Sequence, residues 1–244
     1  WGCKKLPADF MVSNMLKEVG TGTFARCGID STNLPPHVMQ DIYTFVGGKG
    51  EMAPPDAARV VVDVSLDLVG ESFLYECKDI TMLKLPPTLH TIKAGGFSYC
   101  KSLQTIVPQR QNKPHSLKTI EEEAFCKCES LTSIPHFPML GTIRSRAFQD
   151  CWSLTEVTLG PSIISATRDC FDKCTSLFVL NCTYRTGVIL PWKVTHVTID
   201  PNITHIHTSA FAGCNQLHII TLPPSVISLG PSCFWGCKKL PANF

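Results

Sequence analysis

The sequence predicts a repeat solenoid, in which short coils of chain stack on one another. Three observations predict this fold. A segment with the pattern aromatic-x-x-Cys-x-x-aliphatic recurs along the 244 residues, most of its intervals are 23 residues, and the same apolar positions return in each unit. A single coil of this length cannot bury its apolar side, whereas stacked coils bury a continuous core.

The cysteine of the repeated segment sets the spacing of the units. Two intervals differ from 23 residues: the step from Cys100 to Cys128 is 28 residues and contains the polar insertion 109–113, and the step from Cys174 to Cys214 is 40 residues. The longer step holds one full unit and a truncated unit of 17 residues that lacks the aromatic-Cys segment. The segments are 74–80, 97–103, 125–131, 148–154, 171–177, 211–217 and 234–240.

The apolar pattern of each unit predicts the same order of secondary-structure elements. An aliphatic pair two residues apart, such as Leu83 and Leu85, predicts a short strand with one face inward. A Pro-rich turn then breaks the strand, and a second pair, such as Leu89 and Ile92, fills the opposite wall. The Phe-x-x-Cys segment is expected to form one tight helical turn that places Phe and Cys inward.

The repeated pattern resembles that of the BspA-like leucine-rich repeats. The stretches 90–106, 141–164 and 203–229 carry it most clearly. The resemblance implies a right-handed, curved solenoid with short parallel strands on one face and short helical or 3₁₀ turns. It also implies a binding protein and no enzyme, so we expect neither catalytic residues nor a cofactor.

The chain is expected to divide into three parts. Residues 57–244 are the repeat array, residues 34–56 are a degenerate coil and irregular joint, and residues 1–33 are the end of a preceding array with one degenerate coil. Trp1–Phe10 matches Trp235–Phe244 at nine of ten positions, which indicates a duplication. The coil predicted after the first of these decapeptides is marked by the apolar residues Leu16, Val19, Phe24 and Cys27.

Composition narrows the class of partner. Net charge is +2, and charged residues make up 17% of the chain against 44% hydrophobic residues. This balance does not favour a nucleic-acid partner, and no apolar run approaches the length of a membrane span. We expect a monomer that begins in mid-motif and is therefore a fragment.

The cysteines are expected to be core residues. There are thirteen, and those of the repeat run in parallel columns, whereas a tetrahedral metal site needs ligands that converge. Cys170 and Cys233 stand where other units have Ala, as small apolar fillers. We predict no metal site and mostly reduced thiols, which favours the cytoplasm, with a surface or extracellular location left open. His205 and His207 are expected to face solvent as a pair.

The outward residues of the predicted strands are the candidate binding surface. They alternate with the inward aliphatics and are mostly small, neutral and hydroxyl-bearing, which suits an extended protein or glycan partner better than a phosphate backbone. The candidate residues are Lys84, Thr105, Ser133, Glu156, Thr158, Asn181, His196, Thr198 and Thr221.

One segment supports a different function. Residues 34–46 resemble the opening of an F-box, which, with the repeats, would imply a substrate receptor of a ubiquitin ligase. The Cys and Trp of the second half of that motif do not follow Val46. A short motif of this kind arises often by chance, so we keep it as the alternative to the binding module.

Overall fold

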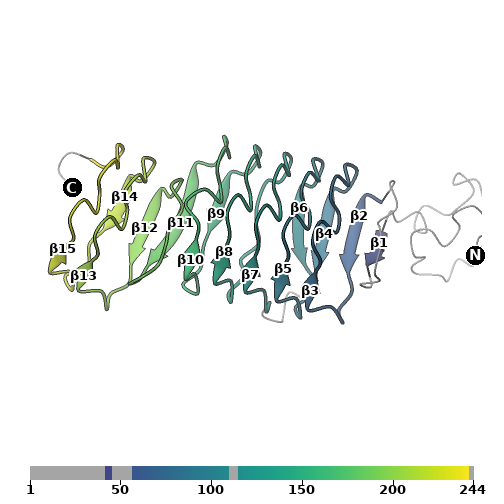
Figure 1. Cartoon of the computed structure of the whole chain (residues 1–244), viewed down its shortest axis with the longest axis horizontal. Helices are drawn as coiled ribbons and strands as arrows, with labels where there is room; N and C mark the ends of the chain where they lie inside the picture. Colours follow the sequence, from purple (N-terminus) through teal and green to yellow (C-terminus); the bar gives the residue numbers. More distant parts are fainter. Residues whose placement is uncertain (1–41, 46–56, 110–114, 242–244) are drawn as a thin grey trace, which may run out of the picture.

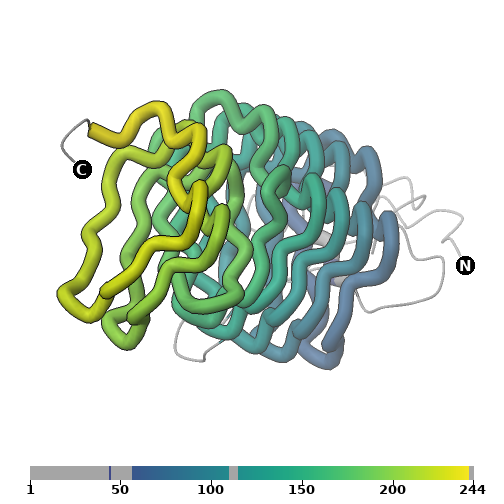
Figure 2. Tube along the Cα trace, turned by 60° about the vertical axis from the view of Figure 1, so that its left-hand side comes forward, coloured from purple at the N-terminus to yellow at the C-terminus, as the bar shows by residue number. Residues whose placement is uncertain are grey.

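The computed structural model describes residues 42–45, 57–109 and 115–241, and for Ile42, Tyr43 and Phe45 it describes the backbone alone. These residues form a parallel-strand β-solenoid of about seven turns, as predicted. Figure 1 shows the coils side by side in one row, with β1 (Ile42–Phe45) at one end and β15 (Ser228–Leu229) at the other. Figure 2 shows the same coils as successive loops around a common interior.

One wall of the solenoid is a ladder of parallel strands, here called the first sheet. It is interrupted once, where Ser133 makes an isolated parallel bridge with Glu156. Buried and outward residues alternate along each strand, as the period of two requires. Its strands are β1, β2 (Arg59–Val62), β4 (Met82–Leu85) and β6 (Thr105–Pro108), then β9 (Glu156–Thr158), β11 (Val179–Tyr184), β12 (His196–Ile199) and β14 (Ile219–Thr221).

A second ladder covers the opposite wall, so the expectation of strands on one face only is wrong. Most coils contribute two residues to this second sheet, and the second residue of the pair points inward, as Ile92 and Ile143 do. The truncated unit contributes only Ile189, which makes an isolated parallel bridge with Ser165. Two residues suffice because neighbouring coils are already in register. The strands are β3 (Leu68–Val69), β5 (Thr91–Ile92), β7 (Thr119–Ile120), β8 (Thr142–Ile143) and β10 (Ser165–Ala166), then β13 (His205–Ile206) and β15.

The Phe-x-x-Cys segment is a chain of tight turns, and the predicted helical turn is wrong; no helix occurs in the described part of the chain. The amides of Gly96, Ser98 and Cys100 each donate to the carbonyl three residues earlier, while the amides between them donate to carbonyls of the next coil. The turns place one residue of each segment at positive φ, which a helix does not allow. These residues are Glu76, Tyr99, Lys127, Asp150, Lys173, Gly213 and Gly236.

A column of phenylalanine rings runs through the core. Phe97, Phe125, Phe148 and Phe171 are almost wholly buried, and consecutive ring centroids lie 5.2, 5.2 and 5.3 Å apart with nearly parallel planes. This is the stack that the 23-residue spacing predicts. Burying each ring contributes roughly 1.5–3 kcal/mol relative to exposure.

The repeat cysteines form a second column, and each thiol is tied to the coil before it. The Sγ atoms of Cys100, Cys128, Cys151 and Cys174 lie 3.1–3.2 Å from a carbonyl oxygen in that coil, to which each thiol donates. A cysteine therefore fills a small apolar space and also satisfies a buried carbonyl. All eleven described cysteines are free thiols.

The truncated unit changes both the core and the register. It supplies no phenylalanine to the column; the ring of Tyr184 takes that place, wholly buried and 4.9 Å from the ring of Phe211. Strand β11 is six residues long because it pairs with β9 through Val179–Asn181 and with β12 through Asn181–Tyr184. The register of the first sheet thus shifts by two residues at this strand.

Candidate functional site: the outer face of the first sheet

The structure places all nine candidate binding residues on the outer face of the first sheet. Eight lie on strands β4, β6, β9, β11, β12 and β14, and Ser133 lies at the isolated bridge. Ser133, Glu156, Thr158, Thr198 and Thr221 are exposed, and the other four are half-buried. The predicted alternation of inward and outward side chains is confirmed.

Strand pairing arranges these residues into columns that run across the strands. One column is Thr158, Asn181, His196 and Ile219, each paired in register with the next. A second column, created by the register shift, is Thr183, Thr198 and Thr221. Parallel strands lie about 4.8 Å apart. Side-chain hydroxyl, amide and imidazole groups therefore follow one another from strand to strand at about that spacing.

Few charges lie on this face. Arg59, Lys84 and Glu156 are its charged strand residues among those described, and none of them takes part in an ion pair within the described ranges. Asn181 instead donates from Nδ2 to Thr158 Oγ1 over 3.2 Å. The face is thus a neutral, hydrogen-bonding surface.

A pair of histidines lies within the face. The imidazole rings of His196 and His218 are 4.9 Å apart and meet edge to face. Thr195 Oγ1 lies 2.7 Å from His196 Nδ1 and also accepts a hydrogen bond from the backbone amide of Leu180. These two contacts fix the orientation of the His196 ring. Burial first, and then the neighbouring charge of His218, lower the pKa of His196. Both effects disfavour the charged imidazolium.

Two exposed residues beside this face were not among the outward residues predicted from the sequence. Phe178 leaves 64% of its surface exposed immediately before β11, and His218 is exposed beside His196. Thr155, Thr132 and Gln104 occupy the position of Phe178 in earlier units. An aromatic residue in an otherwise polar column was the signal in the sequence.

The described residues contain no group of three or more His, Cys, Asp or Glu side chains placed to hold a metal ion. His205 and His207 are both exposed, as predicted. Burial raises the pKa of the Cys214 thiol to about 12, and it raises the pKa values of Cys128, Cys151 and Cys170 well above their ordinary range. Thiolate is the nucleophilic and metal-binding form of cysteine, so these thiols suit packing.

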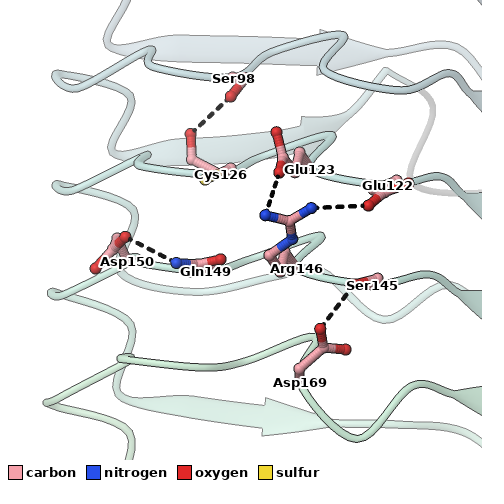
Figure 3. Close-up of polar contacts among 9 residues, drawn as sticks. All are labelled: Ser98, Glu122, Glu123, Cys126, Ser145, Arg146, Gln149, Asp150 and Asp169. Atoms are coloured by element: carbon pink, nitrogen blue, oxygen red, sulfur yellow. Dashed lines mark hydrogen bonds and ion pairs between the residues drawn. The ribbon is translucent and has the colours of Figure 1, made fainter.

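Polar side chains on the turn side of the solenoid join neighbouring coils (Figure 3). Arg146 bridges Glu122 and Glu123 of the preceding coil at 3.0 Å each, and Ser145 donates to Asp169 of the next coil over 2.7 Å. These contacts span 23 or 24 residues in sequence, so they join adjacent coils. The charged groups on this side therefore pair between neighbouring coils, whereas the outer face of the first sheet carries mostly neutral groups.

The fold defines a repeat protein built of stacked parallel-strand coils, and comparison with known families agrees. The model of the BspA-type leucine-rich repeat region matches residues 109–188 and 191–242, with six copies. The chain belongs to this family. Its members are generally non-enzymatic and typically bind proteins.

Solved structures of bacterial leucine-rich repeat proteins are similar to this chain. A T. pallidum leucine-rich repeat protein is 25% identical, with a TM-score of 0.52 and 83% of each chain covered. A cell surface protein from Faecalibacterium prausnitzii is 24% identical, with a TM-score of 0.47, 78% of this chain and 48% of that chain. The pneumococcal vaccine antigen PcpA is 17% identical, with a TM-score of 0.42, 61% of this chain and 35% of that chain. No curated protein gave a significant sequence match.

The F-box alternative gains no support from these findings. Ile42–Phe45, at the end of the segment that resembles an F-box, forms β1 and pairs with β2 in the solenoid. The rest of that segment, and the predicted coil of residues 1–33, lie outside the described residues. Within the described ranges no helix is long and apolar enough to cross a membrane.

Proposed function

We propose that the chain is a non-enzymatic binding module that holds an extended polypeptide across the outer face of the first sheet. The proposed surface is centred on β9, β11, β12 and β14. The observation that carries this proposal is the register: the column of Thr158, Asn181 and His196 offers one polar side chain on each successive strand and ends at the apolar Ile219.

The chemistry of the face favours a polypeptide. Hydroxyl and amide side chains both donate and accept hydrogen bonds, as do the peptide groups of an extended chain. Ile219 is a large exposed apolar side chain on the face, and Phe178 is exposed where the chain enters β11. A few large side chains that become buried in pockets supply most of the energy of protein interfaces. A phosphate backbone would need Lys and Arg side chains, which these columns lack.

The experiment begins with a phage-displayed peptide library selected on the wild-type chain. The enriched peptide is then measured against the double variant Thr158→Arg/Thr198→Arg by fluorescence polarisation. We expect binding to weaken at least tenfold, because two long charged side chains cover both polar columns. An unchanged urea unfolding midpoint shows that the fold is intact.

The matched control is Thr208→Arg, which adds the same side chain at an exposed threonine that follows β13 of the second sheet. This variant should bind the peptide as wild type does. Equal binding by all three proteins would refute the role of the first sheet. Enrichment on a glycan array, without any enriched peptide, would replace the polypeptide with a glycan.

A further inference from the structure

Two imidazole rings from neighbouring coils meet on the outer side of the first sheet. His196 belongs to β12 and is half-buried, whereas His218 directly precedes β14 and is exposed. Their ring centroids are 4.9 Å apart. Neutral imidazole is the commonest metal-binding side chain in proteins, and it suits Zn²⁺, Cu²⁺ and Ni²⁺. The pair therefore brings two metal-binding groups within reach of one ion.

Hydrogen bonds to the Nδ1 atoms determine which nitrogen of each neutral ring is free. His218 Nδ1 lies 2.9 Å from the backbone carbonyl oxygen of Gln216, which can only accept, so Nδ1 carries the proton. Thr195 Oγ1 donates its one proton to the carbonyl oxygen of Leu180 over 3.2 Å, and it therefore accepts from His196 Nδ1 over 2.7 Å. In a neutral imidazole the other nitrogen is then an acceptor. Nε2 of each ring is left with a free lone pair.

A hydrogen-bonded Nδ1 is the arrangement that metal-binding histidines normally have, because the bond orients the ring and raises the basicity of the other nitrogen. Two imidazoles that share one tetrahedral ion through bonds of about 2.0–2.1 Å have centroids roughly 5 Å apart, close to the observed 4.9 Å. The ring planes meet at 68°, and the exposed ring of His218 can rotate so that both Nε2 atoms face one ion. The separation of the rings therefore suits a shared ion without a shift of the strands.

We infer that His196 and His218 together bind one divalent transition-metal ion, such as Zn²⁺, through their Nε2 atoms. This site departs from the expectation of no metal site, which was drawn from the cysteine columns. Within the described residues no group of three or more His, Cys, Asp or Glu side chains is placed to hold a metal ion, so water fills the other two positions of a tetrahedral ion. A carboxylate or imidazole of another molecule can replace that water. Binding of the ion itself does not depend on the proposed polypeptide partner.

A second pair of histidines provides an internal comparison. His205 and His207 are both exposed and stand two residues apart in the sequence. The ring of His207 packs edge to face against Tyr184 with centroids 5.7 Å apart, and within the described residues no ring contact joins it to His205. Because a shared ion would require a ring already packed on Tyr184 to turn away, we expect this pair to bind Zn²⁺ more weakly.

Isothermal titration of the full 244-residue chain with zinc chloride at neutral pH tests the inference. Zn²⁺ has no redox chemistry that would oxidise the thiols. His196→Gln and His218→Gln should each lower the association constant about tenfold or more, because each removes one of the two protein ligands. The matched control His90→Gln, at another exposed histidine, should bind as wild type does. The thiols are the same in every variant, so a difference among variants reports the imidazoles.

Nuclear magnetic resonance of the chain with ¹⁵N-labelled histidine identifies the ligand atoms and does not depend on the stability of a variant. Added Zn²⁺ should shift the Nε2 resonances of His196 and His218, while their Nδ1 atoms stay protonated. A wild-type chain that binds no Zn²⁺ overturns the inference. So does an association constant that either glutamine variant leaves unchanged, or a set of shifts confined to His205 and His207.

Discussion

The five-residue insertion and the truncated unit are opposite departures from the 23-residue repeat, and the solenoid absorbs them differently. Beside the insertion at 109–113, the rings of Phe97 and Phe125 still stack with centroids 5.2 Å apart and planes 17° apart. The truncated unit instead removes a ring position, shifts the sheet register and brings Tyr184 into the core. The ring stack is unchanged across the extra residues, whereas the missing residues are replaced in the core by Tyr184.

The second departure also recruits long side chains to join the coils on either side of it. Arg168 donates from Nη1 to the carbonyl oxygen of Ala212, 44 residues later, over 2.8 Å. Trp192 approaches Gly213 so closely that a Cβ at Gly213 would lie 3.2 Å from its Nε1. These contacts cover the place where the missing turn would stand.

Among single substitutions, the largest expected effect tests whether Tyr184 replaces a phenylalanine of the column. Tyr184→Ala should lower the free energy of unfolding by about 3–5 kcal/mol, because it leaves a cavity against Phe211. Tyr184→Phe should change it little, since the tyrosine hydroxyl accepts one long bond, 3.4 Å from the amide of His207. Urea unfolding followed by circular dichroism measures both. A small loss in the alanine variant would mean that the column is broken at this coil.

Next in size is the thiol column on the two sides of the truncated unit. Cys151→Ala should cost about 1–3 kcal/mol, because it removes a buried donor to the carbonyl of Phe125 at 3.2 Å as well as a buried sulfur. Cys214→Ala removes the same atom, but its Sγ lies 3.8 Å from the carbonyl of Pro191. The loss at Cys214 should be the smaller in the same urea experiment. Equal losses would assign the effect to packing alone.

A pH dependence is expected beside the insertion. His115 is buried against Phe137, neither of its ring nitrogens has a hydrogen-bond partner, and burial lowers its pKa from the ordinary 6.5. The unfolded chain therefore binds more protons than the folded chain just below pH 6.5, so stability is complete above that pH and falls as the pH drops. Urea midpoints at pH 7.5 and 5 should differ less in His115→Leu than in wild type. The control variant His90→Leu, at an exposed histidine, should keep the wild-type difference between the two midpoints. If the difference in His115→Leu were as large as in wild type, His115 would not be the source of the pH dependence.

The smallest effect should come from shortening the insertion. Deleting residues 110–113 should change the free energy of unfolding by less than about 1 kcal/mol, because loop closure depends only weakly on length. Deleting residues 185–188 of the truncated unit should abolish cooperative unfolding, since this stretch includes the buried Val188. If the two deletions were equally tolerated, the contrast between the two regions would not hold.

The sequence predicts the core well because spacing alone determines which residues are inward. Phe148, Cys151 and Leu154 recur at the repeat, and each is wholly buried. The alternation that places Thr158 and Thr198 outward follows from the period of a strand. The solenoid and its candidate binding face can therefore be predicted from the sequence alone.

Other features carry no comparable signal. The positive φ at Lys127 and Lys173 falls on residues that do not favour it, and Gly213 and Gly236 at the same position are the clearest hint of a turn. Two-residue strands are too short for a pattern of alternation, so the second sheet was missed. The role of Tyr184 depends on a register shift, which is a property of three strands together.

The thiol column gives this protein a set of built-in reporters. A maleimide reagent reacts with a buried thiol only when the surrounding coil opens. The thiol must first break its hydrogen bond to the carbonyl oxygen of the preceding coil. Because nearly every coil contains such a sulfur, labelling followed by mass spectrometry would measure the rate at which each coil opens. The order in which the sulfurs react would then show where the repeat array begins to unfold, at its ends or at the truncated unit in its interior.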